Sequence, residues 1–182
     1  MPYHDDLIEQ ARHLAKREPK RPRQASLRRA VSTAYYALFH LLISEATLNW
    51  KKVDQRPLLA RFFEHGKMRA ASDRQRADCS SFIKSNPVLG AKLHCMRHLH
   101  RVAHTFFLAQ QQRHAADYDS AKIWDRIEVL SLIDLVDLTF QSWREIRDEP
   151  IAQAYLFSLV CDSFPLEARI LMLRMLYRGL WL

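Results

Sequence analysis

The sequence has very little glycine, with three residues among 182, whereas an average protein has about 7%. Gly66, Gly90 and Gly179 are too far apart for any two of them to share one phosphate-binding loop. Rossmann and P-loop proteins need such a glycine-rich loop to bring the backbone close to a nucleotide phosphate. The scarcity of glycine therefore excludes both of these protein classes.

Cysteine and long apolar runs are scarce as well. Cys79, Cys95 and Cys161 are an odd number and form no C-x-x-C pair, which is typical of a protein from the reducing cytosol. The N-terminus MPYHDDLIEQ has no apolar signal region, and no stretch reaches the ~18 uninterrupted apolar residues that a membrane span needs. We therefore expect a cytoplasmic protein with no membrane span.

The composition is that of one globular domain with an uneven charge. Apolar residues make up 48% of the chain, enough to bury a core, and the formal net charge is +8. Residues 12–29 carry +7 and residues 51–101 carry +8, whereas residues 102–163 carry −5. This distribution favours an anionic partner, although ordinary solvent-exposed Lys and Arg side chains would give the same total.

Proline residues divide the chain into segments with helical periodicity, and no strand alternation is found. We expect an all-α fold, with a bundle at 1–150 and a C-terminal helical extension at 151–182 that packs on the bundle or on a partner. The expected helices of the bundle are 4–17, 25–49, 57–65, 72–84, 91–114 and 120–147. Gly66 is expected to separate the third from the fourth, and Asp119 or Ser120 to cap the last.

The helix expected at 120–147 is apolar on nearly all sides. One side carries Ile123, Ile127, Leu130 and Leu138, and the other carries Leu132, Val136, Phe140 and Trp143. One small bundle cannot easily cover both sides of such a helix, so this pattern predicts a homodimer.

Polar side chains form a narrow line along the helix expected at 25–49. Arg29, Thr33, Tyr36, His40 and Thr47 lie within about 60° of one another on a helical wheel, whereas most of the remaining circumference is apolar. Two interpretations remain open. Tyr36 and His40 satisfy each other at a packed helix edge, or the line forms the wall of a binding pocket.

Four histidines form two pairs spaced one helical turn apart, His94 with His98 and His100 with His104. Such pairs can chelate a metal, but no third ligand and no catalytic glutamate accompanies them, so we expect a basic helix face and no metal site or other cofactor. Arg97 and His104 share a face at a spacing of seven residues and could act together on a phosphate group.

The segment RHAADYD places Arg113, His114, Asp117 and Tyr118 where one long helix ends. Turns held by rigid helices are frequent functional sites. A structural role remains open, in which Asp117 caps the next helix and Arg113 complements the dipole of the previous one.

Three segments follow one another along the chain, namely RRAVSTAYYALFH, RHAADYD and WREIRDEPIAQAYLFSL. By these segments and their order, the chain resembles the HEPN superfamily of prokaryotic helical proteins over roughly residues 1–160. The resemblance implies an up-and-down bundle of four or five helices, usually homodimeric, in toxin–antitoxin, defence or RNA-processing systems. Many members are metal-independent ribonucleases. A nucleotidyltransferase-type protein is a candidate partner in this context.

The HEPN nucleases use an Arg, a polar neighbour and, after four to six residues, a His. Arg113 and His114 match the first two positions, but Tyr118 stands where the His is expected. A phenol with a pKa near 10 is a poor general base at neutral pH, whereas imidazole is well matched. Arg97 and His104 fit the spacing literally, but they lie earlier in the chain than the family pattern implies.

We therefore expect a catalytically degenerate HEPN-like homodimer that binds RNA, a nucleotide or a partner protein. The alternatives are a metal-independent endoribonuclease and a pure interaction scaffold. Five cations in the proline-broken connection are expected to be extended, exposed and in contact with phosphates, namely Lys16, Arg17, Lys20, Arg21 and Arg23.

Overall fold

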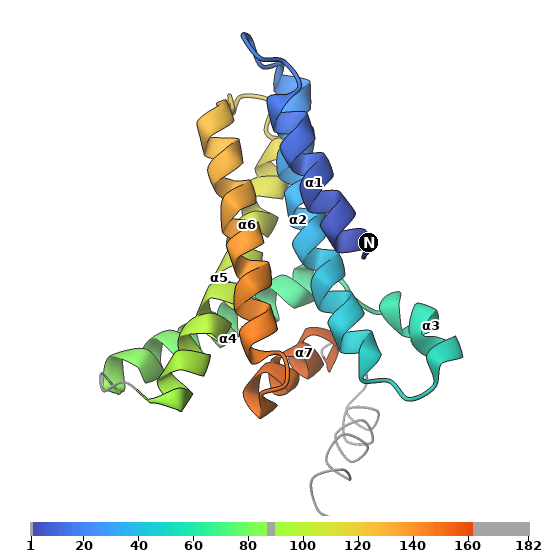
Figure 1. Cartoon of the computed structure of the whole chain (residues 1–182), viewed down its shortest axis with the longest axis vertical. Helices are drawn as coiled ribbons and strands as arrows, with labels where there is room; N and C mark the ends of the chain where they lie inside the picture. The colour runs from blue at the N-terminus through green and yellow to red at the C-terminus, as the bar shows by residue number, and fades with distance from the viewer. Residues whose placement is uncertain (1, 87–89, 162–182) are drawn as a thin grey trace, which may run out of the picture.

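The computed structural model describes residues 2–86 and 90–161, and it confirms the all-α fold (Figure 1). No β-strand occurs in these two ranges. The helices are α1 (Tyr3–Lys16), α2 (Gln24–Leu48), the short 3₁₀ helix η1 (Val53–Gln55), α3 (Arg56–Ala60), α4 (His65–Ser85), α5 (Ala91–Tyr118), α6 (Arg126–Ile146) and α7 (Pro150–Cys161).

Helix α2 is the centre of the bundle. It packs against α1, α5 and α6, and Figure 1 shows these long helices running side by side. Helix α4 pairs with α5, and α7 packs against α4 and α2. The arrangement leaves α1 and α2 adjacent along their length, and the candidate site lies between these two helices.

The core forms around α2 because apolar residues cover most of its circumference. Leu27, Leu38 and Leu42 are fully buried, and small residues such as Ala30 and Ala34 allow neighbouring helices to approach closely. Burial of each leucine stabilises the fold by about 1.5–3 kcal/mol relative to an exposed side chain. Truncation of one of them to Ala would cost about 2–5 kcal/mol because a cavity would remain.

The expected break at Gly66 is wrong. Helix α4 begins at His65 and continues through Gly66, while the separate α3 is limited to Arg56–Ala60. Gly66 lies in the first turn of α4, and the fully buried Met68 anchors this turn in the core. Tertiary packing therefore outweighs the weak helix propensity of glycine.

The two long helices are separated by a turn as expected, but the turn lies later in the chain than expected and the expected cap is wrong. Helix α5 continues to Tyr118, and α6 begins only at Arg126. Asp125 caps α6 by accepting a hydrogen bond from the Glu128 amide at 2.9 Å. Asp119 instead closes the turn by accepting from the amides of Ala121 and Lys122.

Helix α6 is more two-sided than expected. Leu132, Val136, Phe140 and Trp143 are buried. On the opposite side Ile127 is 78% exposed, and the exposed polar residues Ser131, Asp134 and Gln141 interrupt the apolar surface. Ile123, 79% exposed, lies in the turn before the helix and not within it.

Part of the expected C-terminal extension is visible as α7. Its buried Tyr155 shares a 2.8 Å hydrogen bond with Ser72 of α4, so this helix packs on the bundle. The amphipathic helix expected from Leu166 onward lies outside the described residues. Within residues 2–86 and 90–161, no helix is both long and apolar enough to cross a membrane.

Candidate nucleic-acid interface

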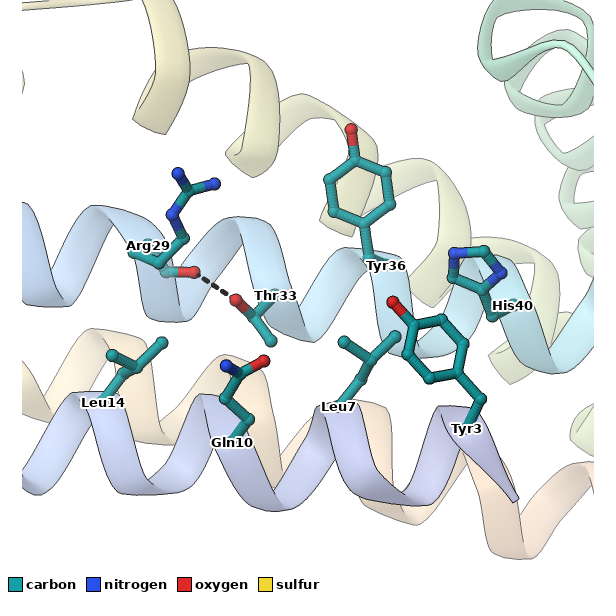
Figure 2. Close-up of a pocket in the computed structure, with 8 residues that line it drawn as sticks. All are labelled: Tyr3, Leu7, Gln10, Leu14, Arg29, Thr33, Tyr36 and His40. Carbon is teal, nitrogen blue, oxygen red and sulfur yellow. Dashed lines mark hydrogen bonds between the residues drawn. The ribbon is translucent and has the colours of Figure 1, made fainter.

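A groove with a volume of about 460 Å³ lies between α1 and α2 (Figure 2). Successive turns of the two helices supply its lining, which consists of Tyr3, Leu7, Gln10, Leu14, Arg29, Thr33, Tyr36 and His40. The α1 residues recur at three- and four-residue spacing and therefore share one face. The α2 residues are four of the five in the predicted polar line, whereas the fifth, Thr47, is buried and does not line the groove.

Aromatic rings gather at one end of this groove. The ring centroids of Tyr3 and His40 are 4.9 Å apart in an edge-to-face arrangement, and those of Tyr36 and His40 are 6.4 Å apart. Figure 2 shows the three rings close together above the start of α1. Tyr3 is 60% exposed, so a flat ring system can reach it from solvent. Aromatic platforms of this kind stack nucleic-acid bases without much sequence preference.

His40 is kept neutral by its surroundings. Burial lowers the pKa of its imidazole, and the neighbouring His4 lowers it further. Tyr36 and His40 form no hydrogen bond with each other among the described contacts, and the Tyr36 hydroxyl accepts one from Arg113 instead. The interpretation in which these two residues satisfy each other is therefore not supported by the contacts.

The other end of the groove is basic. The exposed Arg29 side chain forms no hydrogen bond or ion pair with any described residue. The Thr33 hydroxyl donates to the Arg29 carbonyl at 2.7 Å and so stays within the helix backbone (Figure 2). Leu14 and Arg29 lie at the end where the connection from α1 to α2 leaves the groove. A phosphate group at this end would therefore meet a guanidinium with no competing partner.

Four of the five predicted cations, Arg17, Lys20, Arg21 and Arg23, lie in that connection, whereas Lys16 is the last residue of α1 and is therefore helical and not extended as expected. All five are exposed. The path of the connection is fixed by other groups. The Ser26 hydroxyl donates to Glu18 at 2.9 Å, and Arg126 donates to the carbonyl oxygens of Glu18 and Pro19. Because Arg126 and Glu18 hold the backbone, the cations project from a defined segment.

Arg113 of α5 is linked to the groove by its contact with Tyr36, which lines it. Its Nη2 donates to the Tyr36 hydroxyl at 3.1 Å, and its Nε lies 2.8 Å from Asp117 Oδ2, although the N–H is not directed well enough for a hydrogen bond. Asp117 in turn accepts from the Ser32 hydroxyl at 2.5 Å. Burial would lower the pKa of Arg113, but Tyr36 and Asp117 outweigh it and raise the pKa, so the charge is retained.

Tyr118 and His114 lie beside this ion pair on the solvent side. Tyr118 is 68% exposed, its ring centroid is 5.0 Å from that of His114, and the Arg113 guanidinium carbon is 5.9 Å from the Tyr118 ring. The Tyr118 hydroxyl makes no hydrogen bond to any residue in the described ranges. The structure therefore brings Arg113, His114, Asp117 and Tyr118 together at the end of α5.

Arg97 and His104 are not part of this cluster. Both side chains are exposed on α5, and neither lines the groove between α1 and α2. His104 stacks on His100 with centroids 5.7 Å apart. Among the described residues, no group of three or more His, Cys, Asp or Glu side chains could hold a metal ion.

His65 is a neighbour of the site that the sequence did not indicate. Its Nδ1 lies 2.6 Å from the Tyr35 hydroxyl, and its ring packs 4.3 Å from Phe39. Burial, followed by Arg113 and His40, lowers the pKa of the imidazole. The only signal in the sequence was its position beside Gly66, which was interpreted as the end of a helix.

Comparisons of the chain with protein-family models, with curated proteins and with solved structures found no match.

Proposed function

We propose that the protein is an HEPN-like RNA-binding protein that holds single-stranded RNA, or a nucleotide, in the groove between α1 and α2 without cleaving it. A cytoplasmic, homodimeric protein of a prokaryotic toxin–antitoxin, defence or RNA-processing system fits this role. A nucleotidyltransferase-type protein is the partner that we would seek first.

One observation carries the proposal: the groove has stacking surfaces at one end and an unpaired cation at the other. Tyr3, Tyr36 and His40 supply the rings, and Arg29 supplies a guanidinium with no partner among the described residues. From Arg29 to His40, α2 rises about 16 Å, which suits a short extended strand and not a compact protein domain. The basic connection extends the positive surface beyond Leu14.

The groove also has dimensions suited to a small polar ligand. A volume of about 460 Å³ is within the usual range for ligand pockets, and its walls combine apolar with polar groups. Bases would stack on the aromatic end while phosphates face Arg29 and the connection.

The contacts of Arg113 favour binding over catalysis. A catalytic arginine must be able to reach the phosphate, but this guanidinium is 16% exposed and is held by Asp117 and Tyr36. The group that follows it in the motif is the phenol of Tyr118, which is a weak base at neutral pH. The endoribonuclease alternative would need one of His104, His114 or Tyr118 to move the proton of a ribose 2′-hydroxyl.

The homodimer is supported by apolar side chains that the single chain leaves in solvent. Ile123 and Ile127 are each nearly four-fifths exposed, and Tyr118 lies beside them along the chain. Exposed apolar groups that are close together favour burial against a second surface. Asp134 and Asp137, which lie between Ile127 and Leu138 along the chain, already pair with Arg12 of α1.

The proposal is tested by incubating the purified protein with labelled single-stranded and structured RNA in EDTA. Binding is measured by fluorescence anisotropy, and RNA integrity is measured on a denaturing gel. We expect binding with the RNA left intact. Cleavage that is lost in Tyr118→Phe or His104→Ala would instead establish the endoribonuclease, because removal of a general acid or base reduces the rate by about 10²–10⁴-fold.

A further inference from the structure

Two arginines of α4 stack on one phenylalanine of α5. The guanidinium carbons of Arg69 and Arg76 lie 4.8 Å and 4.6 Å from the ring centre of Phe107. Arg69 and Arg76 are seven residues apart, so both side chains leave α4 on the same face, toward α5. Phe107 is half-buried, and the stacking therefore lies at the edge of the α4–α5 contact and not in the core.

The positive charge of this pair is only partly balanced. Asp73 pairs with Arg76, with Nε 2.7 Å and Nη2 2.5 Å from the same carboxylate oxygen. Arg69 forms no ion pair with any residue of the described ranges, and its Nε is buried without a hydrogen-bond partner. A buried N–H without a partner is destabilising, so an acceptor at this position would stabilise the protein.

Two imidazoles extend the same face along α5. The rings of His100 and His104 stack with centroids 5.7 Å apart and an interplanar angle of 7°. Burial, then His104 and Arg76, lowers the pKa of His100, so Arg76 is near enough to act on it. The neutral imidazole of His100 still offers an N–H donor, which adds hydrogen-bonding capacity beside the two guanidiniums.

We propose that this α4–α5 arginine pair, Arg69 with Arg76 on Phe107, binds a phosphate group. The site goes beyond the RNA groove, because none of its residues lines the space between α1 and α2. The helices also differ in their neighbours. Helix α1 lies against α2 and α6, whereas α4 lies against α5 and α7 (Figure 1).

Stacking explains why the ligand is a phosphate. A guanidinium that rests on an aromatic ring uses its face for the cation–π contact, so its N–H groups point away from the ring at its edge. Asp73 contacts Nε and Nη2 of Arg76, so the donors left for a ligand are the remaining N–H groups of Arg76 and those of Arg69. Two oriented edges can give an oxyanion several charge-assisted hydrogen bonds. The stack also restricts the side-chain rotamers before the ligand arrives, so less entropy is lost on binding.

The phosphate can come from an RNA backbone or from a free phosphate ion, and arginine Nε–Hε resonances distinguish these sources. We would titrate the full-length protein with inorganic phosphate and, separately, with a single-stranded oligoribonucleotide. Shifts of the Arg69 and Arg76 resonances with inorganic phosphate would assign a free-phosphate site. Shifts with RNA alone would assign a backbone site. No shift of either resonance with either ligand would overturn the proposal.

Matched variants separate this site from the groove. Arg69→Gln with Arg76→Gln should lose at least tenfold in affinity for the responding ligand, whereas Lys51→Gln with Lys52→Gln removes the same charge from an exposed turn and should not. Equal losses would overturn the proposal.

Two further variants test the site if the Gln pair does not fold, and separate it from the groove. Arg69→Lys with Arg76→Lys keeps the charge if the Gln pair unfolds, and it should still lose affinity because an ammonium lacks the planar fork. Wild-type affinity in this Lys pair would count against the site. If Tyr3→Ala with Arg29→Gln abolishes RNA binding but the phosphate-induced shifts persist, the arginine pair stands independently of the proposed function.

Discussion

Neutralising three unpaired cations, one at the end of α1 and two in the connection that follows it, should flatten the salt dependence of RNA binding. Lys16, Lys20 and Arg21 are exposed and form no hydrogen bond or ion pair with described residues, so each is available for a phosphate contact. Arg17 differs because its Nε lies 3.9 Å from Glu18, and Arg126 differs because it holds the backbone of the connection. The triple variant Lys16→Gln, Lys20→Gln, Arg21→Gln therefore removes binding charge and leaves the fold unchanged.

The size of the effect follows from counterion release. Each phosphate contact to a single strand contributes about 0.7 to the slope of log affinity against log salt. Loss of three contacts should reduce the slope by about 2. Between 50 mM and 200 mM salt, the wild type should therefore lose about 20-fold more affinity than the triple variant. The measurement is fluorescence anisotropy with a labelled oligoribonucleotide at four or more salt concentrations.

The control variant is Lys51→Gln, Lys52→Gln, Lys84→Gln, which removes the same charge from exposed positions away from the groove. A general loss of net charge would change both slopes equally. Parallel slopes for the two triple variants would refute the assignment of the connection to phosphate binding.

Three other predictions concern the support of the site, its pH dependence and the assembly. Arg28 donates to the carbonyl oxygens of Ala116, Ser120 and Lys122. Arg28→Ala should therefore destabilise the protein by about 1.5–3 kcal/mol in urea denaturation, without a change in the salt dependence of RNA binding. Wild-type stability of this variant would contradict the prediction. Burial lowers the pKa values of His40 and His65, so near and below pH 6.5 the native state binds fewer protons than the unfolded state. The free energy of unfolding should therefore be at its full value above pH 6.5 and should fall as the pH drops through the lowered pKa values. Thermal unfolding from pH 7.5 to 5 checks this, and a pH dependence that His40→Gln with His65→Gln does not reduce would count against it. Sedimentation equilibrium should find a dimer that Ile127→Glu dissociates, whereas a 21.5 kDa wild-type monomer at micromolar concentration would remove the homodimer proposal.

The fold could be predicted because its main features are periodic along the chain. Helix α2 repeats apolar residues around most of its circumference, and this pattern alone indicated both its buried side and the polar line with Arg29 and Tyr36. The line was visible in advance because all five of its members lie on one helix. Its neighbour across the groove, Tyr3, was not visible, because only the packing of α1 on α2 brings it there.

Contacts between helices account for what the sequence could not indicate. Tyr35 and His65 are 30 positions apart, and Arg113 and Tyr36 are 77 positions apart, so no local pattern links them. The turn before α6 was misplaced for a different reason. Asp119 and Asp125 are both good caps, and only the turn geometry decides which of them accepts from the helix.

Ultraviolet crosslinking of bound single-stranded RNA, followed by mass spectrometry of the crosslinked peptides, tests the central claim most directly. Stacked aromatic rings crosslink readily to bases, so the proposed binding mode predicts crosslinks to Tyr3, Tyr36 or His40, on RNA that remains full-length. Crosslinks that avoid all three residues, at an RNA concentration that saturates the protein, would contradict binding in the groove between α1 and α2.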